Sequence, residues 1–312
     1  MRIIFFGSPT EAVESLKLLV SIGHDVAAAY TRPNRRAGRG RAETPTPVRQ
    51  FAGAQGIPVH TPASLRNNPT ELERLVALNA DVFVVVAYGR ILPAEVLKVP
   101  PLGVVNIHPS LLPAYRGTSP VVTAILDGQT HTGVTVMLLD AGMDTGPILA
   151  QSPPVLLTGR ERGASLQAQL FSEGASMLAA VLAGLQDGTV VPVPQDDAKA
   201  TVTRLIERSD GKIDWSQPAA QIDRSVRAYD PWPGTFTTWD GKGLKILDVS
   251  LLAEAGPNPG PGKIDVQDGR LFVGTGSGPL EVTRLQLEGR RVVSAGDFLR
   301  GQPEIARATL GD

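Results

Sequence analysis

The sequence contains no cysteine. This absence excludes disulfide bonds, thiolate nucleophiles and cysteine-ligated metal ions. It also fits a reducing compartment, so we expect a cytoplasmic protein. The four histidines show no His-Glu-x-x-His spacing, so no zinc site is indicated and we expect no metal.

Net charge and long apolar runs are also scarce. The formal net charge is −1 over 312 residues, which argues against a general nucleic-acid coat. Any contact with nucleic acid therefore has to come from a local patch. Apolar residues make up 42% of the chain, but no run approaches the roughly 20 residues of a membrane-spanning helix. We expect no membrane partner.

The first half of the chain alternates short apolar segments with helix-like stretches. Continuous apolar strands separated by helices predict a mostly parallel sheet covered on both faces, as in a Rossmann-like α/β domain. The expected strands are residues 2–6, 26–31, 81–87 and 103–108. Between the first two, a helix is expected with Ser8 as its cap, Pro9 in its first turn, Glu11 completing a capping box and Gly23 at its end.

The composition changes near residue 190. Residues 190–200 resemble an exposed connector, and after Trp215 a helix is expected at 219–229. Short β segments follow, separated by turn signals at Asp240-Gly241 and Asp268-Gly269. Their ranges are 235–239, 244–249, 262–267, 270–274 and 280–286. We predict a domain at 1–189, a linker at 190–207 and a small OB-like β-barrel at 208–312; Trp215 and Trp232 are expected to be packing residues.

Asn106 and His108 stand at the end of the fourth expected strand, which Pro109 terminates. Residues two apart on a strand point the same way, and open α/β sheets bind ligands at the carboxyl edge. An amide that stabilises an oxyanion beside an imidazole that moves protons suits acyl transfer. The alternative is that the pair only anchors a loop.

A second candidate element is the loop Asp140–Gly146, which follows an expected strand at 134–139. A carboxylate beside His108 would orient the imidazole and stabilise its charged form. Asp144 is the candidate for this role. The loop also resembles a plain turn or a calcium loop, although it lacks the EF-hand pattern.

Three segments together carry a family resemblance: Asn106–Gly117, Gly133–Val136 and Asp140–Gly146. Their combination closely resembles the signature of the 10-formyltetrahydrofolate-dependent formyltransferases. The resemblance implies formyl transfer from 10-formyltetrahydrofolate, as cosubstrate, to an amine. It also implies that Asn106, His108 and Asp144 are the catalytic residues and that no metal takes part.

The resemblance further implies a folate site held largely by backbone groups. The residues that it assigns there are Tyr88, Gly89, Arg90, Ile91, Leu92, Ser110, Leu111, Leu112, Pro113, Asp140 and Gly142.

The resemblance extends over nearly the whole chain to the family members that formylate initiator methionyl-tRNA. The segments that carry it are Val84–Gly89, Lys212–Trp215 and Arg227–Gly234. It implies that initiator methionyl-tRNA is the partner, that the domain at 208–312 binds tRNA, and that the product serves translation initiation. We expect a monomer.

The segment Arg32–Arg41 contains five arginines and no acidic residue. Its glycines permit close approach of the backbone to a crowded surface. With the resemblance, this loop is expected to grip the tRNA acceptor stem through Arg35, Arg36, Arg39 and Arg41. The alternative is a solvated loop.

Two other functions stay open at this point. His-Pro-Ser-Leu-Leu-Pro, residues 108–113, also occurs in relatives that formylate small amines, so an amino sugar nucleotide is the alternative acceptor. A non-catalytic RNA-binding module is the alternative outside enzymes, but it would not require Asn106, His108 and Asp144 together.

Overall fold

The computed structural model describes residues 1–37, 42–252 and 258–311, without the side chains of 35–37, 42 and 43. The chain forms two compact units. The first unit contains Met1–Pro120, His131–Leu156 and Gln167–Thr203, and the second contains Val121–Thr130, Leu157–Leu166 and Arg204–Asp312. The domain boundaries expected at 189 and 208 stay predictions.

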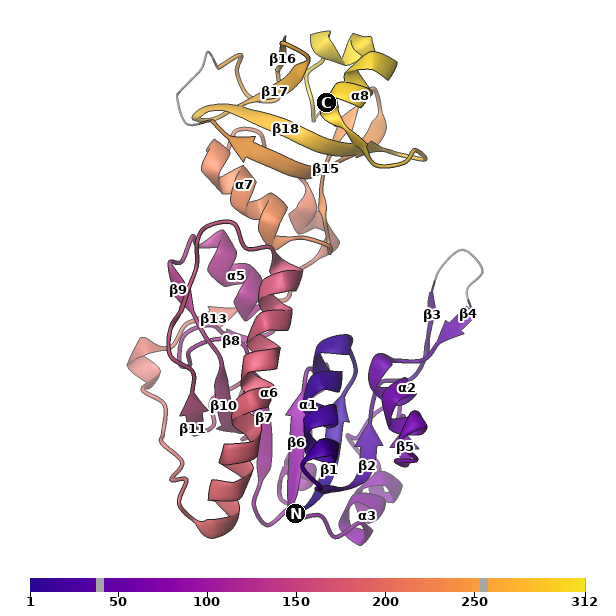
Figure 1. Cartoon of the computed structure of the whole chain (residues 1–312), viewed down its shortest axis with the longest axis vertical. Coiled ribbons are helices and arrows are strands. Elements are labelled where there is room, and N and C mark those ends of the chain that lie inside the picture. The colour runs from indigo at the N-terminus through magenta and orange to yellow at the C-terminus, as the bar shows by residue number, and fades with distance from the viewer. Residues whose placement is uncertain (38–41, 253–257, 312) are drawn as a thin grey trace. The chain divides into compact units, whose positions relative to one another are not determined.

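A seven-stranded sheet forms the centre of the first unit (Figure 1). Its order is β11 (Ile148–Gln151), β10 (Thr135–Leu138), β7 (Val104–His108), β6 (Val82–Val86), β1 (Arg2–Gly7), β2 (Asp25–Tyr30) and β5 (Val59–His60). The five strands from β7 to β5 are parallel, whereas β10 runs antiparallel to both of its neighbours. The predicted mostly parallel, Rossmann-like sheet is confirmed.

Helices cover both faces of this sheet. The helices are α1 (Thr10–Ser21), α2 (Pro47–Ala54), α3 (Pro69–Ala77), α4 (Ala94–Leu97) and α6 (Gly163–Asp187). Helix α5 (Pro120–Leu126) belongs almost entirely to the second unit. Helix α6 packs closely on β7, because a Cβ at Gly174 would lie 2.4 Å from Ile107. The opposite face is buried with α3 and α4 in a cluster that includes Phe6, Phe83 and Val104. Since side chains alternate along a strand, Asn106 and His108 lie on the face opposite α6.

Among the described residues, α6 is also the one helix long and apolar enough to span a membrane by length and composition. Of its most apolar window, 44% is buried. Leu170, Leu178 and Leu182 are buried almost completely, as expected for a core helix.

The predicted start of α1 is wrong. Pro9 is the N-cap, without a side-chain hydrogen bond. The Ser8 hydroxyl instead donates to the Tyr88 carbonyl oxygen at 3.2 Å, and the Glu11 carboxylate accepts from Gln167. Tertiary partners therefore take both groups that the capping box would have used. The predicted end is confirmed, because Gly23 follows the helix with φ of +82°.

Three two-stranded ladders flank the main sheet. They are β3 (Arg35–Ala37) with β4 (Ala42–Thr44), β8 (Arg116–Gly117) with β13 (Val202–Thr203), and β9 (His131–Thr132) with β12 (Val155–Leu156). The connector is exposed along most of 190–200, as predicted, and includes the short helix η1 (Asp197–Lys199). Through β13, however, it joins the loop that follows β7, and Thr203 is buried there.

An antiparallel sheet around an apolar core forms most of the second unit. Its strands are β14 (Thr235–Trp239), β15 (Lys242–Leu251), β16 (Ile264–Gln267), β17 (Arg270–Thr275), β18 (Gly278–Leu287) and β19 (Val293–Ser294). Its helices are η2 (Arg208–Gly211), α7 (Ala219–Ala228), α8 (Ala295–Gly301) and η3 (Pro303–Arg307). The antiparallel strand order β14-β15-β18-β17-β16 bears out the predicted small barrel-type domain. Positive φ at Asp240, Gly241, Asp268 and Gly269 confirms both predicted turns.

The two tryptophans differ in environment. Trp215 is buried and donates from Nε1 to the Thr237 hydroxyl at 3.1 Å, which confirms its packing role. Trp232 is 56% exposed, so the packing role predicted for it is wrong. Prolines on both sides of Trp232 keep this short segment out of any helix or strand that would bury it.

Candidate functional site

Strand β7 places the first two candidate residues. Its last residues, Asn106 and His108, are both buried and lie on the same face at the carboxyl edge. The Asn106 side chain makes no hydrogen bond within the part of the chain that the structure describes. Its amide is therefore available as a donor to a ligand.

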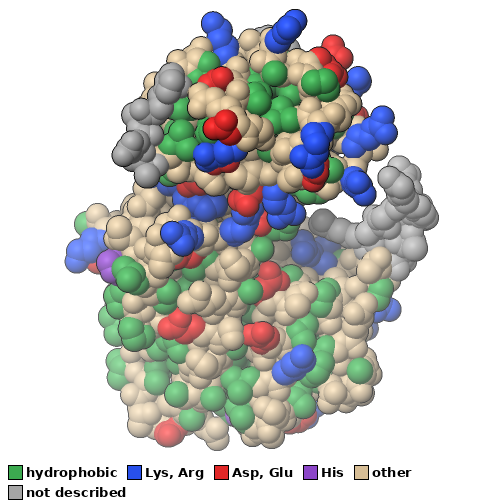
Figure 2. Space-filling model, turned by 45° about the horizontal axis from the view of Figure 1, so that its top comes forward, with side chains coloured by type: hydrophobic (Ala, Val, Ile, Leu, Met, Phe, Trp, Pro, Cys, Tyr) green, Lys and Arg blue, Asp and Glu red, His purple; other side chains and the backbone are tan. Residues whose placement is uncertain are grey.

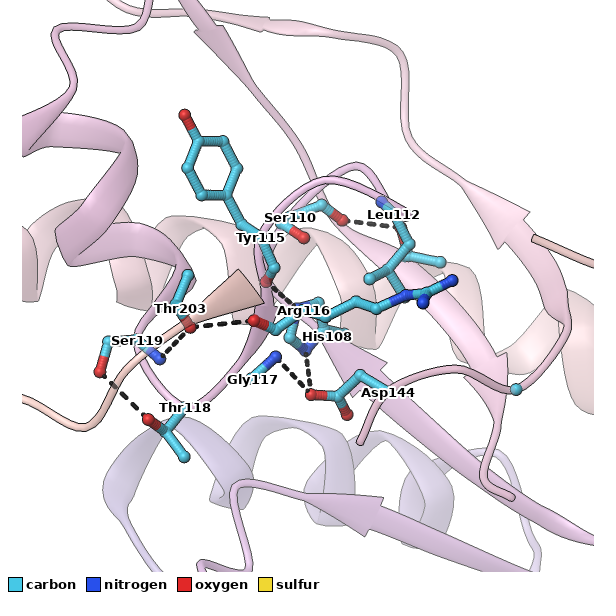
Figure 3. A network of polar contacts seen from close by, with 12 residues as sticks. His108, Ser110, Leu112, Tyr115, Arg116, Gly117, Thr118, Ser119, Asp144 and Thr203 are labelled. Carbon is cyan, nitrogen blue, oxygen red and sulfur yellow. Dashed lines mark hydrogen bonds and ion pairs between the residues drawn. The ribbon is translucent and has the colours of Figure 1, made fainter. Parts of the chain in front are cut away.

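A backbone contact fixes the imidazole of His108. Nε2 lies 2.9 Å from the carbonyl oxygen of Tyr115, as Figure 3 shows. A carbonyl oxygen only accepts, so Nε2 carries the hydrogen. In the neutral ring, Nδ1 is then the basic atom.

Asp144 faces that basic atom. Its Oδ2 lies 3.7 Å from His108 Nδ1 and accepts a hydrogen bond from the Gly117 amide at 2.9 Å. Asp144 has a φ of +53°, which is uncommon for a residue with a side chain. The loop thus holds Asp144 in a costly conformation that directs its carboxylate at the imidazole (Figure 3).

Opposing effects set the proton affinity of His108. Burial lowers its pKa and is the largest effect, while the Asp144 carboxylate and the Tyr115 carbonyl raise it. The net result is a pKa below the ordinary value of 6.5. His108 is therefore a neutral base at neutral pH, and it can gain a proton beside a stabilising carboxylate.

The other acidic residue of the loop has a structural contact. Asp140 Oδ1 accepts from the Gly142 amide at 3.0 Å and from the Thr145 hydroxyl at 2.7 Å. Asp140 and Gly142 are exposed. Among the described residues, no group of three or more acidic or histidine side chains could hold a metal ion.

The segment after β7 is largely tied to the protein. The Ser110 hydroxyl donates to the Ala114 carbonyl at 2.6 Å, and the Leu112 amide donates to Thr135 at 3.1 Å. Ser110 and Leu112 are buried, whereas Leu111 and Pro113 are half-buried. This leaves few side-chain groups of the segment for a ligand.

The loop after β6 divides into inward and outward residues. Tyr88 and Leu92 belong to the core, and burial raises the pKa of Tyr88 to about 12. Ile91 is 79% exposed, and Gly89 is exposed with φ of +73°. Gly89 and Ile91 are thus the exposed residues of this loop, and Arg90 between them is half-buried.

The structure describes only part of the segment that contains the predicted tRNA-binding arginines. Arg39 and Arg41 lie outside the described residues, and of Arg35 and Arg36 only the backbone in β3 is described. Their contacts with tRNA stay a prediction.

Comparisons with known proteins identify the family of the chain. The formyl transferase family matches residues 1–210, and the formyl transferase C-terminal domain family matches residues 205–303. A methionyl-tRNA formyltransferase of Roseiflexus sp. (strain RS-1) is 49% identical, with 100% of this chain and 96% of the relative covered. That of Chloroflexus aurantiacus (strain ATCC 29366 / DSM 635 / J-10-fl) is 48% identical over 96% of this chain and 97% of its own.

The chain belongs to the methionyl-tRNA formyltransferase family. Solved structures of more distant relatives share the fold. The N-formyltransferase of Helicobacter canadensis, in complex with folinic acid and dTDP-3-aminofucose, has a TM-score of 0.68 at 20% identity, covering 90% of this chain and 98% of its own. HypX of Aquifex aeolicus has a TM-score of 0.66 at 21% identity, covering 96% of this chain and 48% of its own.

The structure brings His108 and Asp144 into contact distance and places Asn106 on the same strand face. Sequence reasoning missed the groups that hold them, which are the Tyr115 carbonyl and the Gly117 amide. Both residues lie in the segment that carries the formyltransferase signature. Almost every residue type supplies a backbone carbonyl and amide, however, so the sequence does not reveal which backbone groups make these contacts. Gly117 has φ of +103°, and its need for glycine was the available signal.

Proposed function

We propose that this enzyme transfers the formyl group of 10-formyltetrahydrofolate to the amino group of initiator methionyl-tRNA, forming formylmethionyl-tRNA for translation initiation. The observation that carries the proposal is the buried His108 imidazole. Its hydrogen lies on the Tyr115 side and its basic Nδ1 faces Asp144, next to the unpartnered amide of Asn106.

These three residues have distinct roles in the proposed reaction. Asn106 donates a hydrogen bond to the oxygen of the formyl group as the amine adds to its carbon. His108 takes a proton from the attacking nitrogen at Nδ1 and returns it to the departing N10 of the folate. Asp144 stabilises the imidazolium between these two steps. One bond forms, one breaks, and no net proton is gained or lost.

We assign the formyl donor to the loops that follow β6 and β10. Gly89, Ile91, Asp140 and Gly142 are exposed and Arg90 is half-buried, whereas Tyr88, Leu92, Ser110 and Leu112 are occupied in packing or internal hydrogen bonds. We therefore assign recognition of the pterin to the backbone of the first five residues.

Two features support tRNA as the acceptor. The segment Arg32–Arg41 is the densest run of positive charge in the sequence. Lysine and arginine side chains also gather over the second unit on the face drawn in Figure 2. Because the net charge is only −1, phosphate contacts have to come from such local clusters.

The location and state of the enzyme are part of the same proposal. We place it in the cytoplasm as a monomer that has no membrane partner. The absence of cysteine and the core packing of α6 support this placement.

A formylation assay with alternative acceptors tests the function. Purified enzyme and 10-formyltetrahydrofolate are offered initiator methionyl-tRNA, elongator methionyl-tRNA or a dTDP-linked amino sugar. We expect efficient transfer to the initiator tRNA alone. Transfer to the amino sugar with none to tRNA would contradict the proposal and favour the sugar enzyme.

A further inference from the structure

Gln195 lies in the connector, far from the signature segments, yet it contacts the loop that carries Asp144. Its Nε2 donates to the carbonyl oxygen of Asp144 at 2.8 Å and to that of Gly146 at 2.7 Å. Its Oε1 accepts from Nε of Arg116 at 2.9 Å. Every polar atom of the Gln195 amide is thereby engaged with residues of the site.

These bonds act on a constrained backbone. Asp144 has φ of +53°. At Gly146 the loop passes so close to β10 that a Cβ there would lie 2.0 Å from the Leu138 carbonyl oxygen. Packing against β10 thus restricts the backbone at Gly146. The two hydrogen bonds from Gln195 restrain the same loop at the carbonyl oxygens of Asp144 and Gly146.

Arg116 links the same amide to the partners of His108. It is 6% exposed and stands between Tyr115, which accepts from His108, and Gly117, which donates to Asp144. Its guanidinium also binds Asp197 at 2.7 Å, and its backbone amide binds the Thr201 carbonyl at 2.8 Å. The connector therefore contacts both segments beside the imidazole, which are the loop with Asp144 and the segment Tyr115–Gly117.

We propose that Gln195 is a positioning residue for formyl transfer, which holds the Asp144 backbone so that its carboxylate faces His108, while Arg116 orients the Gln195 amide. This inference rests on the proposed function, since it assumes that Asp144 assists His108. It adds a residue outside the catalytic motif on which the chemical step depends.

The first test is kinetic and uses Gln195→Met, which keeps the length of the side chain and removes its donors and acceptor. We expect single-turnover formylation to slow by about 10–100-fold, by analogy with the loss when the outer hydrogen-bond partners of metal ligands are removed. KM for both substrates should change little, because the Gln195 amide is engaged entirely within the protein. Asp196→Ala is the matched control: it removes the cap of η1 but leaves the Gln195 bonds in place, and it should keep the wild-type rate.

The second test reads the site without any reaction. The chain has four histidines, so the His108 imidazole can be followed by NMR titration of histidine-labelled protein. Among the described residues, Asp144 is the charged group that faces His108, and its carboxylate raises the His108 pKa against the effect of burial. Gln195→Met should therefore lower this pKa in the direction that Asp144→Asn lowers it. General loosening would admit water and raise the pKa instead, and that result would overturn the proposal.

A double-mutant cycle separates the inference from the proposed function. Gln195→Met should cost little further rate in an Asp144→Asn background if Gln195 acts through Asp144. Additive losses, or a wild-type rate for Gln195→Met beside a slow Asp144→Asn, would overturn the role of Gln195 alone. A wild-type rate for Asp144→Asn would instead contradict the proposed function. Where Gln195→Met folds poorly, Gln195→Glu, whose carboxylate cannot donate to the two carbonyls, replaces it.

Discussion

His108 combines two requirements that oppose each other in water. Its burial keeps the ring neutral, because desolvation lowers the pKa. The Asp144 carboxylate and the Tyr115 carbonyl work in the other direction and make the charged ring tolerable once a proton arrives. His108 is therefore unprotonated and able to accept a proton at neutral pH, and it stays unprotonated on mild acidification.

The pH dependence of the reaction follows from this balance. Since a free Nδ1 is required, kcat/KM should fall only as pH drops through the lowered pKa of His108, below the ordinary 6.5. In Asp144→Asn the opposing carboxylate is lost, so the acidic limb should move to still lower pH while the plateau rate falls. Initial rates across a pH series measure both. An apparent pKa of 6.5 or higher for the acidic fall of kcat/KM in the wild type would contradict this interpretation of the site.

Sequence and structure contributed differently to the residues of the site. Asn106, His108 and Asp144 could be proposed as catalytic residues because their side chains lie in the segments that carry the family resemblance. Tyr115 and Gly117 act through a carbonyl and an amide that every residue type supplies, so their roles required the fold. Gln195 acts across 51 residues of chain, and no local pattern connects it with Asp144.

At the scale of elements, strand β8 links the connector to the site. Gly117 has φ of +103°, and a Cβ there would lie 2.7 Å from the Thr203 carbonyl oxygen. Gly117→Ala should therefore separate β8 from β13 and withdraw the amide that binds Asp144. We expect a loss of about 1–3 kcal/mol in the free energy of unfolding, as for other strained backbone positions, together with a lower kcat.

The control for this variant is Gly159→Ala, at φ of +80° with no heavy atom near a Cβ. It carries the backbone strain without the clash, so it should lose less stability and retain kcat. Urea unfolding and single-turnover rates measure the two effects. Equal losses in both variants would show that the contact with Thr203 is unimportant.

The ends of β1, β2 and β6 are joined by the hydroxyl of Ser8. It donates to the Tyr88 carbonyl and accepts from the Arg32 amide, each at 3.2 Å. Ser8→Ala should remove the partner of the buried Tyr88 carbonyl and of the part-buried Arg32 amide, and should cost about 1–3 kcal/mol in the free energy of unfolding. Ser21→Ala, whose hydroxyl binds the Leu18 carbonyl at an exposed position, should cost much less. Equal effects in denaturant unfolding would refute the anchoring role.

Ser8 also shows where prediction of elements failed. Most strands of the two main sheets were predictable because apolar runs and Asp-Gly turns follow from local chemistry, whereas β5, β11 and β19 were not predicted. A serine before a helix is equally a good cap, but here its hydroxyl is used by a neighbouring loop. The antiparallel placement of β10 likewise depends on the route of the chain across the sheet, which the residues of β10 do not specify.

For the whole molecule, recognition of a polyanion by a chain of net charge −1 has to be local. If Arg39 pairs with an acceptor-stem phosphate, Arg39→Ala should reduce the slope of log affinity against log salt by about 0.7–0.9. It should also narrow the preference for initiator over elongator methionyl-tRNA. Measurement of kcat/KM for both tRNAs across a salt series tests this. An unchanged slope and preference would show that the loop is merely solvated.

The central claim is that His108 moves the proton during formyl transfer at the edge of β7. Single-turnover formylation of initiator methionyl-tRNA by His108→Ala tests it most directly, with the exposed His131 replaced by alanine as the control. We predict that His108→Ala folds normally but reacts about 10²–10⁴-fold more slowly, and that His131→Ala reacts at the wild-type rate. A folded His108→Ala enzyme with wild-type single-turnover kinetics would contradict the account.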